Sequence, residues 1–230
     1  MIKNSLIKIG EKSKKIQSRI LNSKQKNNVL KDYYLLIKKN KNKILKKKIV
    51  GSIIRNGKIR SILVDTKIKT KNNKVFERSV LIEKPGVIII PVLYYKKISY
   101  TVLVKQFRIC RGEDTFEFPS GQAENNNIAL EAIKELKEET SIKIKKTDLK
   151  KLDSIQMITS SNSSVAHYFY FEKKIKKKFL NFLDNKITGN LSENELLSLK
   201  VFKIKDLYKI NIANIFSGLT MLRKKKIIKF

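Results

Sequence analysis

The chain contains few of the side chains that form covalent or metal cross-links. Its 230 residues include one cysteine, Cys110, and one histidine, His167. A single cysteine excludes a disulfide within the chain, and one cysteine with one histidine cannot complete a Cys/His zinc site. We interpret both residues as structural. The sequence also lacks an apolar run as long as a membrane span, so no membrane partner is expected.

Acidic residues are scarce relative to basic ones. The sequence has 52 Lys and Arg against 20 Asp and Glu, and its formal net charge is +32. One interpretation is contact with a polyanion, such as RNA bound through a basic surface. The other is a nucleotide bias, because Lys, Ile and Asn rise together in AT-rich genomes. We prefer the second, since no Arg-rich or aromatic-interleaved nucleic-acid motif accompanies the lysines.

Residues 1–48 differ in composition from the rest and are expected to be a basic N-terminal extension. They hold 16 Lys or Arg against only Glu11 and Asp32. Apolar residues at Ile16 and Ile20, and again from Val29, indicate one or two short helices that end before residue 46. The extension is interpreted as a basic tail or helical arm of a cytoplasmic protein. If it acts as a transit sequence, the location is a mitochondrion or plastid.

Residues 49–230 are long enough for one domain with an ample core. Apolar residues recur with period two from Ile49, and Asn56-Gly57 predicts a hairpin turn between two strands. Further strands are expected over 62–69 and 75–82. The run 87–93 is apolar on both faces, which predicts a central strand covered on two sides.

The remaining elements are expected in the order strand, helix, strands, helix. The strands are predicted over 100–107, 153–159, 165–171 and 196–204. A short helix within a surface insertion at 173–190 is expected to be anchored by Phe179, Leu180, Phe182 and Leu183. The last helix is predicted from Asp206 onward, with its buried side formed by Ile212, Ile215, Leu219 and Leu222.

The segment 116–144, FEFPSGQAENNNIALEAIKELKEETSIKI, gathers carboxylates on one face of a predicted helix. Glu131, Glu135, Glu138 and Glu139 share that face. Lys134 and Lys137 interleave these charges only in part, and the adjacent face is small and aliphatic, as in a helix packed on a core. Carboxylates beside a glycine-containing loop predict a divalent-cation site. The alternative is a solvated helix with ordinary Glu–Lys pairs.

This segment resembles the signature of the Nudix hydrolases: Gly, five residues, Glu, seven residues, then Arg-Glu-aliphatic-x-Glu-Glu-x-Gly-aliphatic. Residues 134–142, KELKEETSI, match the three glutamates of its second half with Glu135, Glu138 and Glu139. Lys134 replaces the Arg, and Ser141 replaces the late Gly. The spacing from Gly121 to Lys134 is one residue short, and Asn126 or Asn127 stands where the first Glu is expected.

Two further pieces resemble the ADP-ribose and ADP-sugar pyrophosphatase branch of that family. They are LVKQFR at 103–108, for LVxQxR, and FEFPSG at 116–121, for ELPAG. The resemblance covers about 49–227. It implies an α+β fold, an α/β/α sandwich with a mixed central sheet and flanking helices, preceded by extra antiparallel strands through which a homodimer forms. The loop 160–164 lacks the branch's usual prolines and acidic residues, which leaves the substrate open.

The resemblance also implies roles for residues of this chain, with Mg²⁺ or Mn²⁺ as cofactor. The metal ligands would be Glu135, Glu139, a shared Glu138 and the main-chain carbonyl of Ser120. Glu138 is also a candidate base, and Glu195, or failing it Glu193, would orient or deprotonate the attacking water. The substrate-binding residues would be Arg108, Arg111 and Gly121, the arginines through phosphate or ribose.

Three functions are compatible with these residues. The leading hypothesis is Mg²⁺-dependent hydrolysis of ADP-ribose or another ADP-sugar to AMP and a sugar phosphate. The alternative is a catalytically weak or inactive Nudix-fold subunit of a nucleic-acid-containing assembly, which the +32 charge and the degenerate first half of the signature favour. A third is an enzyme that acts on a nucleotide or an RNA cap, with the basic charge steering the substrate.

Overall fold

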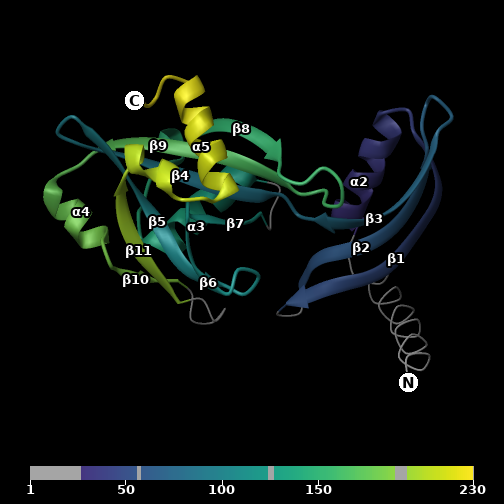
Figure 1. The fold of residues 1–230 in the computed structure, drawn as a ribbon, viewed down its shortest axis with the longest axis horizontal. Coiled ribbons are helices and arrows are strands. Elements are labelled where there is room, and N and C mark those ends of the chain that lie inside the picture. Colours follow the sequence, from purple (N-terminus) through teal and green to yellow (C-terminus); the bar gives the residue numbers. More distant parts are fainter. Residues whose placement is uncertain (1–26, 56–57, 124–126, 190–195, 230) are drawn as a thin grey trace. The chain divides into compact units, whose positions relative to one another are not determined.

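The computed structural model describes residues 27–55, 58–123, 127–189 and 196–229 (Figure 1). Its contacts divide the chain into two units. The first unit is Met1–Lys84 with Gln156–Val165, and the second is Pro85–Ile155 with Ala166–Phe230. No helix in the described part of the chain is long and apolar enough to cross a membrane.

The first unit is one helix with a three-stranded antiparallel sheet of order β1-β2-β3. Its elements are α2 (Asn27–Lys39), β1 (Lys43–Arg55), β2 (Lys58–Lys69) and β3 (Val75–Glu83). Ile54 pairs with Ile59, so the predicted hairpin is present, although the Asn56-Gly57 turn lies outside the described residues. The first strand begins at Lys43, six positions before the start that the sequence pattern predicts.

The core of the first unit is small. Ile62, Val64 and Ile82 are buried, and Tyr33 and Tyr34 of α2 pack against them. The segment 156–165 joins the sheet side of this unit through the main chain. Ser161 accepts a hydrogen bond of 2.7 Å from the N–H of Leu81, and the Leu81 carbonyl accepts one of 3.0 Å from Ser163.

The second unit is a mixed sheet with helices. Its strands are β4 (Gly86–Tyr95), β5 (Ile98–Arg108), β6 (Glu113–Glu117), β7 (Ser120–Gln122), β8 (Lys150–Gln156), β9 (Val165–Lys174), β10 (Ile187–Thr188) and β11 (Leu197–Lys203). Its helices are α3 (Ile128–Thr140), α4 (Lys177–Leu183), α5 (Ala213–Lys224) and the 3₁₀ turns η2 (Lys146–Asp148) and η4 (Ile204–Lys209). The main order is β10-β11-β5-β4-β9-β8, with β4 parallel to β9 and antiparallel to β5.

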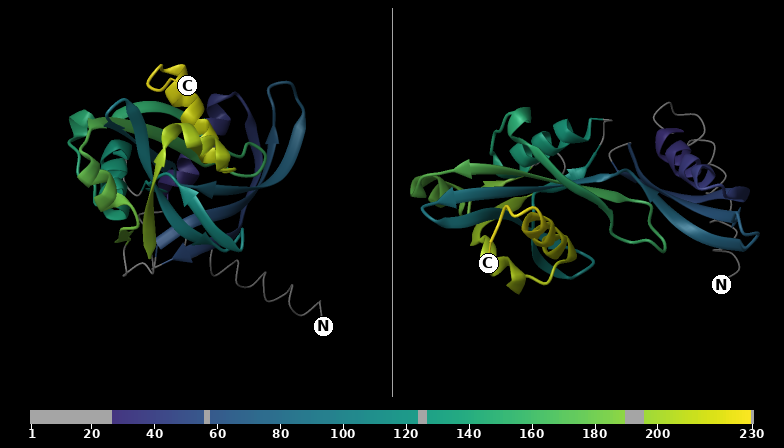
Figure 2. Two further views of the ribbon diagram at one scale, coloured as in Figure 1. Left: turned by 60° about the vertical axis from the view of Figure 1, so that its left-hand side comes forward. Right: turned by 90° about the horizontal axis from the view of Figure 1, so that it is seen from above.

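Strand β4 is buried on both faces, as its apolar run predicts. Val87, Ile89 and Leu93 face a core that includes residues of α3 and α4. Ile88, Ile90 and Val92 face a second core that includes residues of η4 and α5. Figure 2 shows α3 and α5 on opposite faces of this sheet. The α+β fold class and the α/β/α sandwich are therefore confirmed, and the fold is consistent with a Nudix-like one.

Some element boundaries differ from those predicted. Strand β8 ends at Gln156, three residues before its predicted end, and the chain from there to Val165 belongs to the first unit. The last helix begins at Ala213, after a 3₁₀ turn over Ile204–Lys209, and not at Asp206. Its buried residues include Ile215, Leu219 and Leu222 as predicted, while Ile212 precedes it as the N-cap.

The sheet opens between β4 and β5, and this opening positions the site. In the described residues the two strands pair at Leu93–Tyr95 beside their connecting turn. Farther along, β5 pairs with β6 and β4 pairs with β7 instead. Neither short strand is evident in the sequence, because β6 contains Glu and Asp and β7 contains Gly, which are depleted in strands, and because the pairing of both depends on distant partners. The chain from β6 to β7 thus fills the opening and delivers Pro119–Gly121 to the side of α3.

Candidate active site

Helix α3 is fixed at both ends by its own sequence. It begins after Asn127, whose side-chain oxygen accepts a hydrogen bond of 3.2 Å from the N–H of Leu130. This gives a capping role to one of the asparagines that stand where the signature has its first Glu; Asn126 lies outside the described residues. Ala132 and Leu136 are fully buried and anchor the helix on the core. The helix ends at Thr140, and its C-cap Ser141 adopts a left-handed conformation with φ of 61°.

The structure brings Glu135 and Gly121 together. A β-carbon built on Gly121 would lie 2.5 Å from Oε2 of Glu135, and closer still to the rest of that carboxylate. Real β-carbons do not approach other atoms so closely, and only glycine allows the main chain of β7 to pass here. The carboxylate of Glu135 is therefore held against the backbone of the loop before α3.

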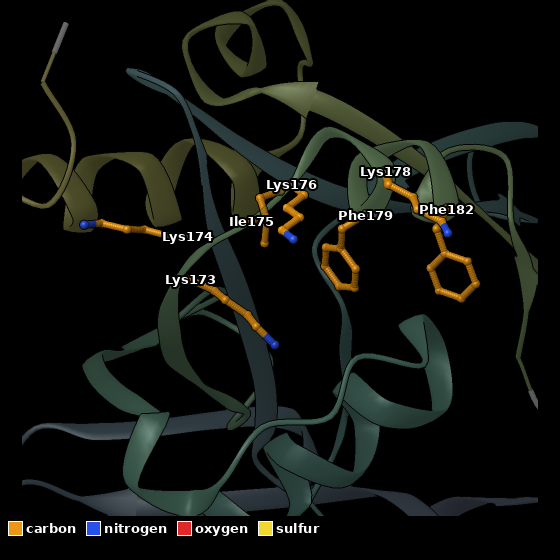
Figure 3. A pocket seen from close by; sticks show the side chains of 7 residues that line it. All are labelled: Lys173, Lys174, Ile175, Lys176, Lys178, Phe179 and Phe182. Carbon is orange, nitrogen blue, oxygen red and sulfur yellow. The ribbon is translucent and has the colours of Figure 1, made fainter.

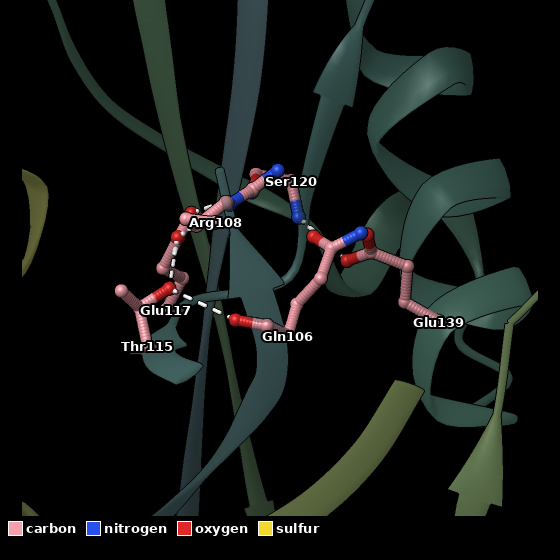
Figure 4. Close-up of polar contacts among 6 residues, drawn as sticks. All are labelled: Gln106, Arg108, Thr115, Glu117, Ser120 and Glu139. Carbon is pink, nitrogen blue, oxygen red and sulfur yellow. Dashed lines mark hydrogen bonds and ion pairs between the residues drawn. The ribbon is translucent and has the colours of Figure 1, made fainter. Parts of the chain in front are cut away.

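The structure also brings Glu139 and Ser120 together (Figure 4). The Ser120 N–H donates a hydrogen bond of 2.8 Å to Oε2 of Glu139. Ile89 donates to the Pro119 carbonyl and Ala123 donates to that of Pro85, so the β4–β7 hydrogen bonds flank Ser120. In an antiparallel pair, main-chain groups alternate in direction. The Ser120 carbonyl therefore points away from β4, as its N–H does.

The other two glutamates of α3 have different surroundings. Glu131 is buried, at 3% exposure. The Glu138 side chain is 41% exposed, and its Oε2 lies 3.8 Å from Nζ of Lys134. The four positions spread over about 100° of the helix circumference. The loop before α3 can cover only part of that circumference. Glu135 and Glu139 therefore meet the loop, while Glu131 and Glu138 do not.

The donor groups at the loop fit a hard divalent cation, which takes oxygen ligands. In the part of the chain that the structure describes, no group of three or more His, Cys, Asp and Glu side chains could hold a metal. Mg²⁺, however, is commonly bound by one or two carboxylates together with waters and substrate phosphates. Glu135, Glu139 and the Ser120 carbonyl would supply such a set. Glu138 would complete it only by turning away from Lys134.

Arg108 forms a bidentate ion pair with Glu117, which is not among the site residues predicted from the sequence. Its Nε and Nη2 donate hydrogen bonds of 2.8 and 2.7 Å to the carboxylate of Glu117, which also accepts 2.6 Å from Oγ1 of Thr115 (Figure 4). Burial acts to raise the pKa of Glu117, but the bonds from Arg108 and Thr115 outweigh it and leave that pKa below its usual value. The register of β5 and β6 aligns these groups.

Gln106 lies in the same part of β5 and was also not selected. Its main chain accepts a hydrogen bond of 3.4 Å from Oγ1 of Thr115. In Figure 4 its side chain extends toward the carboxylate of Glu139. Gln106 is part of the LVKQFR piece, and Glu117 is part of FEFPSG. Both residues therefore lie in segments that the sequence already marked. Only the pairing of β5 with β6 in the structure shows that the two segments lie side by side.

The remaining predicted residues are at the surface or outside the described chain. Arg111 pairs with Glu113, with a hydrogen bond of 2.9 Å from Nε, and both side chains are about half exposed, at 47% and 57%. Glu193 and Glu195 lie outside the described residues, so a water-orienting role for either stays a prediction.

The single cysteine and the single histidine are not part of this arrangement. Cys110 is exposed and forms no disulfide. His167 of β9 lines a separate groove of about 670 Å³ with Lys146 and Lys151, among others. Its Nδ1 lies 2.7 Å from Oγ of Ser154. Burial, followed by the charge of Lys151, lowers the pKa of His167.

Comparison with known proteins gives a fold match. No family model matches the sequence, and no curated protein matches it. Among solved structures, one described as a crystal structure of an ADP compounds hydrolase aligns with a TM-score of 0.56 and 16% identity. The alignment covers 80% of this chain and 93% of that one. At this identity the similarity shows a shared fold.

Proposed function

We propose that this protein is a divalent-metal-dependent pyrophosphatase that hydrolyses ADP-ribose or another ADP-sugar to AMP and a sugar phosphate. The observation that carries the proposal is the placement of the Glu135 and Glu139 carboxylates against the main chain of Ser120 and Gly121. Similarity in fold to an ADP compounds hydrolase supports the choice of substrate class.

Phosphoryl chemistry explains why this placement is useful. Both phosphates of an ADP-sugar are anionic and repel an attacking oxygen. A divalent cation, when bound, supplies neutralisation of that charge and a more acidic water. Glu135, Glu139 and the Ser120 carbonyl would hold Mg²⁺ or Mn²⁺. Gly121 fixes the position of Glu135, and the Ser120 N–H fixes that of Glu139, so both carboxylates are oriented before the substrate binds.

Other residues would handle the proton and the substrate. Glu138 is exposed and stands on the same helix, so it is our first candidate to accept the proton of the attacking water; Glu195 is the second. Glu117 orients the guanidinium of Arg108 through two hydrogen bonds. Arg108 would therefore present a fixed charged plane to a phosphate or ribose, with Arg111 as a more exposed partner.

Purified full-length protein with Mg²⁺ or Mn²⁺ and a panel of substrates tests the proposal. The panel is ADP-ribose, ADP-glucose, NADH and a nucleoside triphosphate, with AMP and sugar phosphate measured by chromatography. We expect Glu135→Gln and Glu139→Gln to reduce kcat by about 100-fold or more. Glu172→Gln is the control, because Glu172 pairs with Lys150 and not with the loop before α3.

Absence of turnover for every substrate, with Glu139→Gln indistinguishable from the parent, would overturn the enzymatic proposal. It would favour the alternative, an inactive subunit of a nucleic-acid-containing assembly. That alternative is supported by the +32 charge and by the exposure of Glu138, which leaves two carboxylates at the loop. Turnover of the triphosphate alone would favour an enzyme acting on nucleotides.

A further inference from the structure

A basic groove beside α4 lies outside the candidate active site. It has a volume of about 420 Å³ and is lined by Lys173, Lys174, Ile175, Lys176, Lys178, Phe179 and Phe182 (Figure 3). We name it the α4 groove. Its lining side chains are lysines and apolar residues, without a carboxylate. The sequence 173–178 places five lysines in six positions, so the groove would attract an anion.

Two phenylalanines place a pair of nearly parallel aromatic rings at the groove. The rings of Phe179 and Phe182 have centroids 6.4 Å apart and planes 24° from parallel. The Phe182 side chain is 56% exposed, whereas Leu180 and Leu183 of the same helix are buried. The prediction that Phe182 anchors the helix was therefore wrong. The two leucines already attach the helix to the core, and Phe182 turns to the solvent because it lies about 100° from Leu183 around the helix axis.

Each ring also has a lysine ammonium nearby. Nζ of Lys186 lies over the Phe182 ring, 4.3 Å from its centroid, and Nζ of Lys173 lies over the Phe179 ring, 5.8 Å from its centroid, so a base that stacks on either ring must displace the ammonium or use the opposite face. A flat ring beside a positive charge matches one nucleotide, which joins a flat base to a negative phosphate. The expectation from sequence that no aromatic-interleaved motif accompanies the lysines missed this surface, although both rings follow the lysines directly in the sequence. The exposure of Phe182 was not evident before the structure of α4 was known.

The nearest carboxylates in the sequence do not neutralise the groove. Asp184 accepts hydrogen bonds from the Val201 N–H at 2.9 Å and from Nζ of Lys200 at 3.3 Å. Glu172 accepts hydrogen bonds from Nζ of Lys150 at 3.1 Å and from Tyr94 at 3.0 Å. Both acidic side chains are thus directed to partners other than the lysines of the groove.

We propose that the α4 groove binds single-stranded nucleic acid, with bases stacked on Phe179 and Phe182 and phosphates beside the lysines. A duplex fits less well, because its bases hide their flat faces within the stack. A membrane surface also fits less well, since α4 has only seven residues and presents only two large rings, of which Phe179 is partly buried. Stacking does not read base edges, and lysine has no hydrogen-bond acceptor, so weak sequence preference is expected.

Fluorescence anisotropy with the full chain tests the proposal. The probes are labelled dodecamers of uridine and of thymidine, titrated at several KCl concentrations. We expect both to bind, with affinity that falls steeply as salt rises. Phe182→Ala should weaken binding about 5- to 150-fold, the range of base–aromatic stacking, while leaving the salt dependence nearly unchanged. For a single strand, each lysine–phosphate contact contributes about 0.7 to the magnitude of the slope of log K against log[KCl]. Lys176→Gln with Lys178→Gln removes two such contacts and should reduce that magnitude by about 1.4.

A matched control separates the groove from the general charge of the chain. Lys205→Gln with Lys225→Gln removes two exposed lysines, one on η4 and one after α5, and this variant should bind both dodecamers as the parent does. Equal losses for the two lysine pairs, or no effect of Phe182→Ala in a protein with unchanged urea midpoint, would overturn the proposal. Binding to anionic vesicles without binding to either dodecamer would overturn it too.

This inference does not depend on the proposed hydrolysis. Phe182 lies on α4, while the carboxylates of the candidate active site lie on α3. Phe182→Ala should therefore retain the parent's hydrolysis of ADP-ribose. Loss of oligonucleotide binding with retained turnover supports the groove as a separate site. If the parent shows no turnover at all, the binding assay still decides the proposal.

Discussion

The main chain at Gly121 passes so close to Glu135 that a β-carbon at this position would lie 2.5 Å from the carboxylate oxygen Oε2. Gly121→Ala must therefore displace the Glu135 side chain or the loop. Misplacement of a catalytic group by about 1 Å can reduce a rate about 100-fold. We expect Gly121→Ala to reduce kcat/KM for ADP-ribose by that order and to raise the Mg²⁺ concentration needed for half-maximal rate.

Gly86→Ala is the matched control for this prediction. Gly86 belongs to the strand paired with β7, and a β-carbon there meets the Gly121 carbonyl at an ordinary 3.7 Å. This variant should retain most of the activity and the parent's Mg²⁺ dependence. If Gly86→Ala and Gly121→Ala lose activity equally, the close approach of Gly121 to Glu135 has no special role.

The Arg108–Glu117 pair should stabilise the fold as well as orient the guanidinium. Arg108→Gln leaves the partly buried carboxylate of Glu117, at 16% exposure, without its bidentate partner. Arg108 itself is 40% exposed, so solvent screening reduces the effect, and we expect a loss of about 1 kcal/mol in the free energy of unfolding. Arg111→Gln, at the exposed pair with Glu113, should cost less. Urea denaturation at pH 7 measures both.

The same pair has a defined pH dependence. The pKa of Glu117 in the folded protein is below its usual value of 4.5. Its ion pair therefore contributes stability that is present above about pH 4.5 and is lost as the pH falls through the lower folded pKa. The difference in unfolding free energy between parent and Arg108→Gln should shrink as the pH falls below 4.5. A constant difference from pH 7 to pH 3 would show that the variant acts through packing instead.

Patterns that depend on one segment were predicted well from the sequence. The apolar run of β4 has a single interpretation, a strand covered on both faces, and both cores use it. Helix α3 follows from its aliphatic stripe, and the loop before it follows from Gly121. In each case the signal lies within about ten consecutive residues. Propensity and periodicity are therefore sufficient to find these elements.

Features that depend on distant partners were not predicted. Strand β7 exists because β4 supplies its hydrogen bonds, and Glu117 meets Arg108 because β6 pairs with β5. The burial of Glu131 and the exposure of Phe182 depend on which part of each helix circumference the rest of the unit covers. The spacing of residues within one helix does not show which side of that helix the rest of the protein covers. The sequence pattern could therefore not predict whether Glu131 or Phe182 would be buried.

Ser141 occupies the position where the signature of the Nudix hydrolases has glycine, and its backbone shows the reason for that preference. Its φ of 61° is left-handed, which costs a residue with a β-carbon about 1–2 kcal/mol. Ser141→Gly should therefore raise the free energy of unfolding, by about 1 kcal/mol. Ser141→Ala is the control and should not stabilise the protein. Equal effects of the two substitutions in thermal and urea denaturation would contradict this explanation.

His167 should make the protein less stable in mild acid. Burial, with a smaller effect of the Lys151 charge, holds its folded pKa below the ordinary value of 6.5. As the pH falls from 7.5 to 5.5, the unfolded chain therefore takes up more protons than the folded one, and the free energy of unfolding decreases. Because His167 is the only histidine, His167→Gln should flatten this dependence, whatever it costs at pH 7.5. Urea midpoints at the two pH values measure the slopes, and parallel slopes for parent and variant would assign the acid sensitivity to other groups.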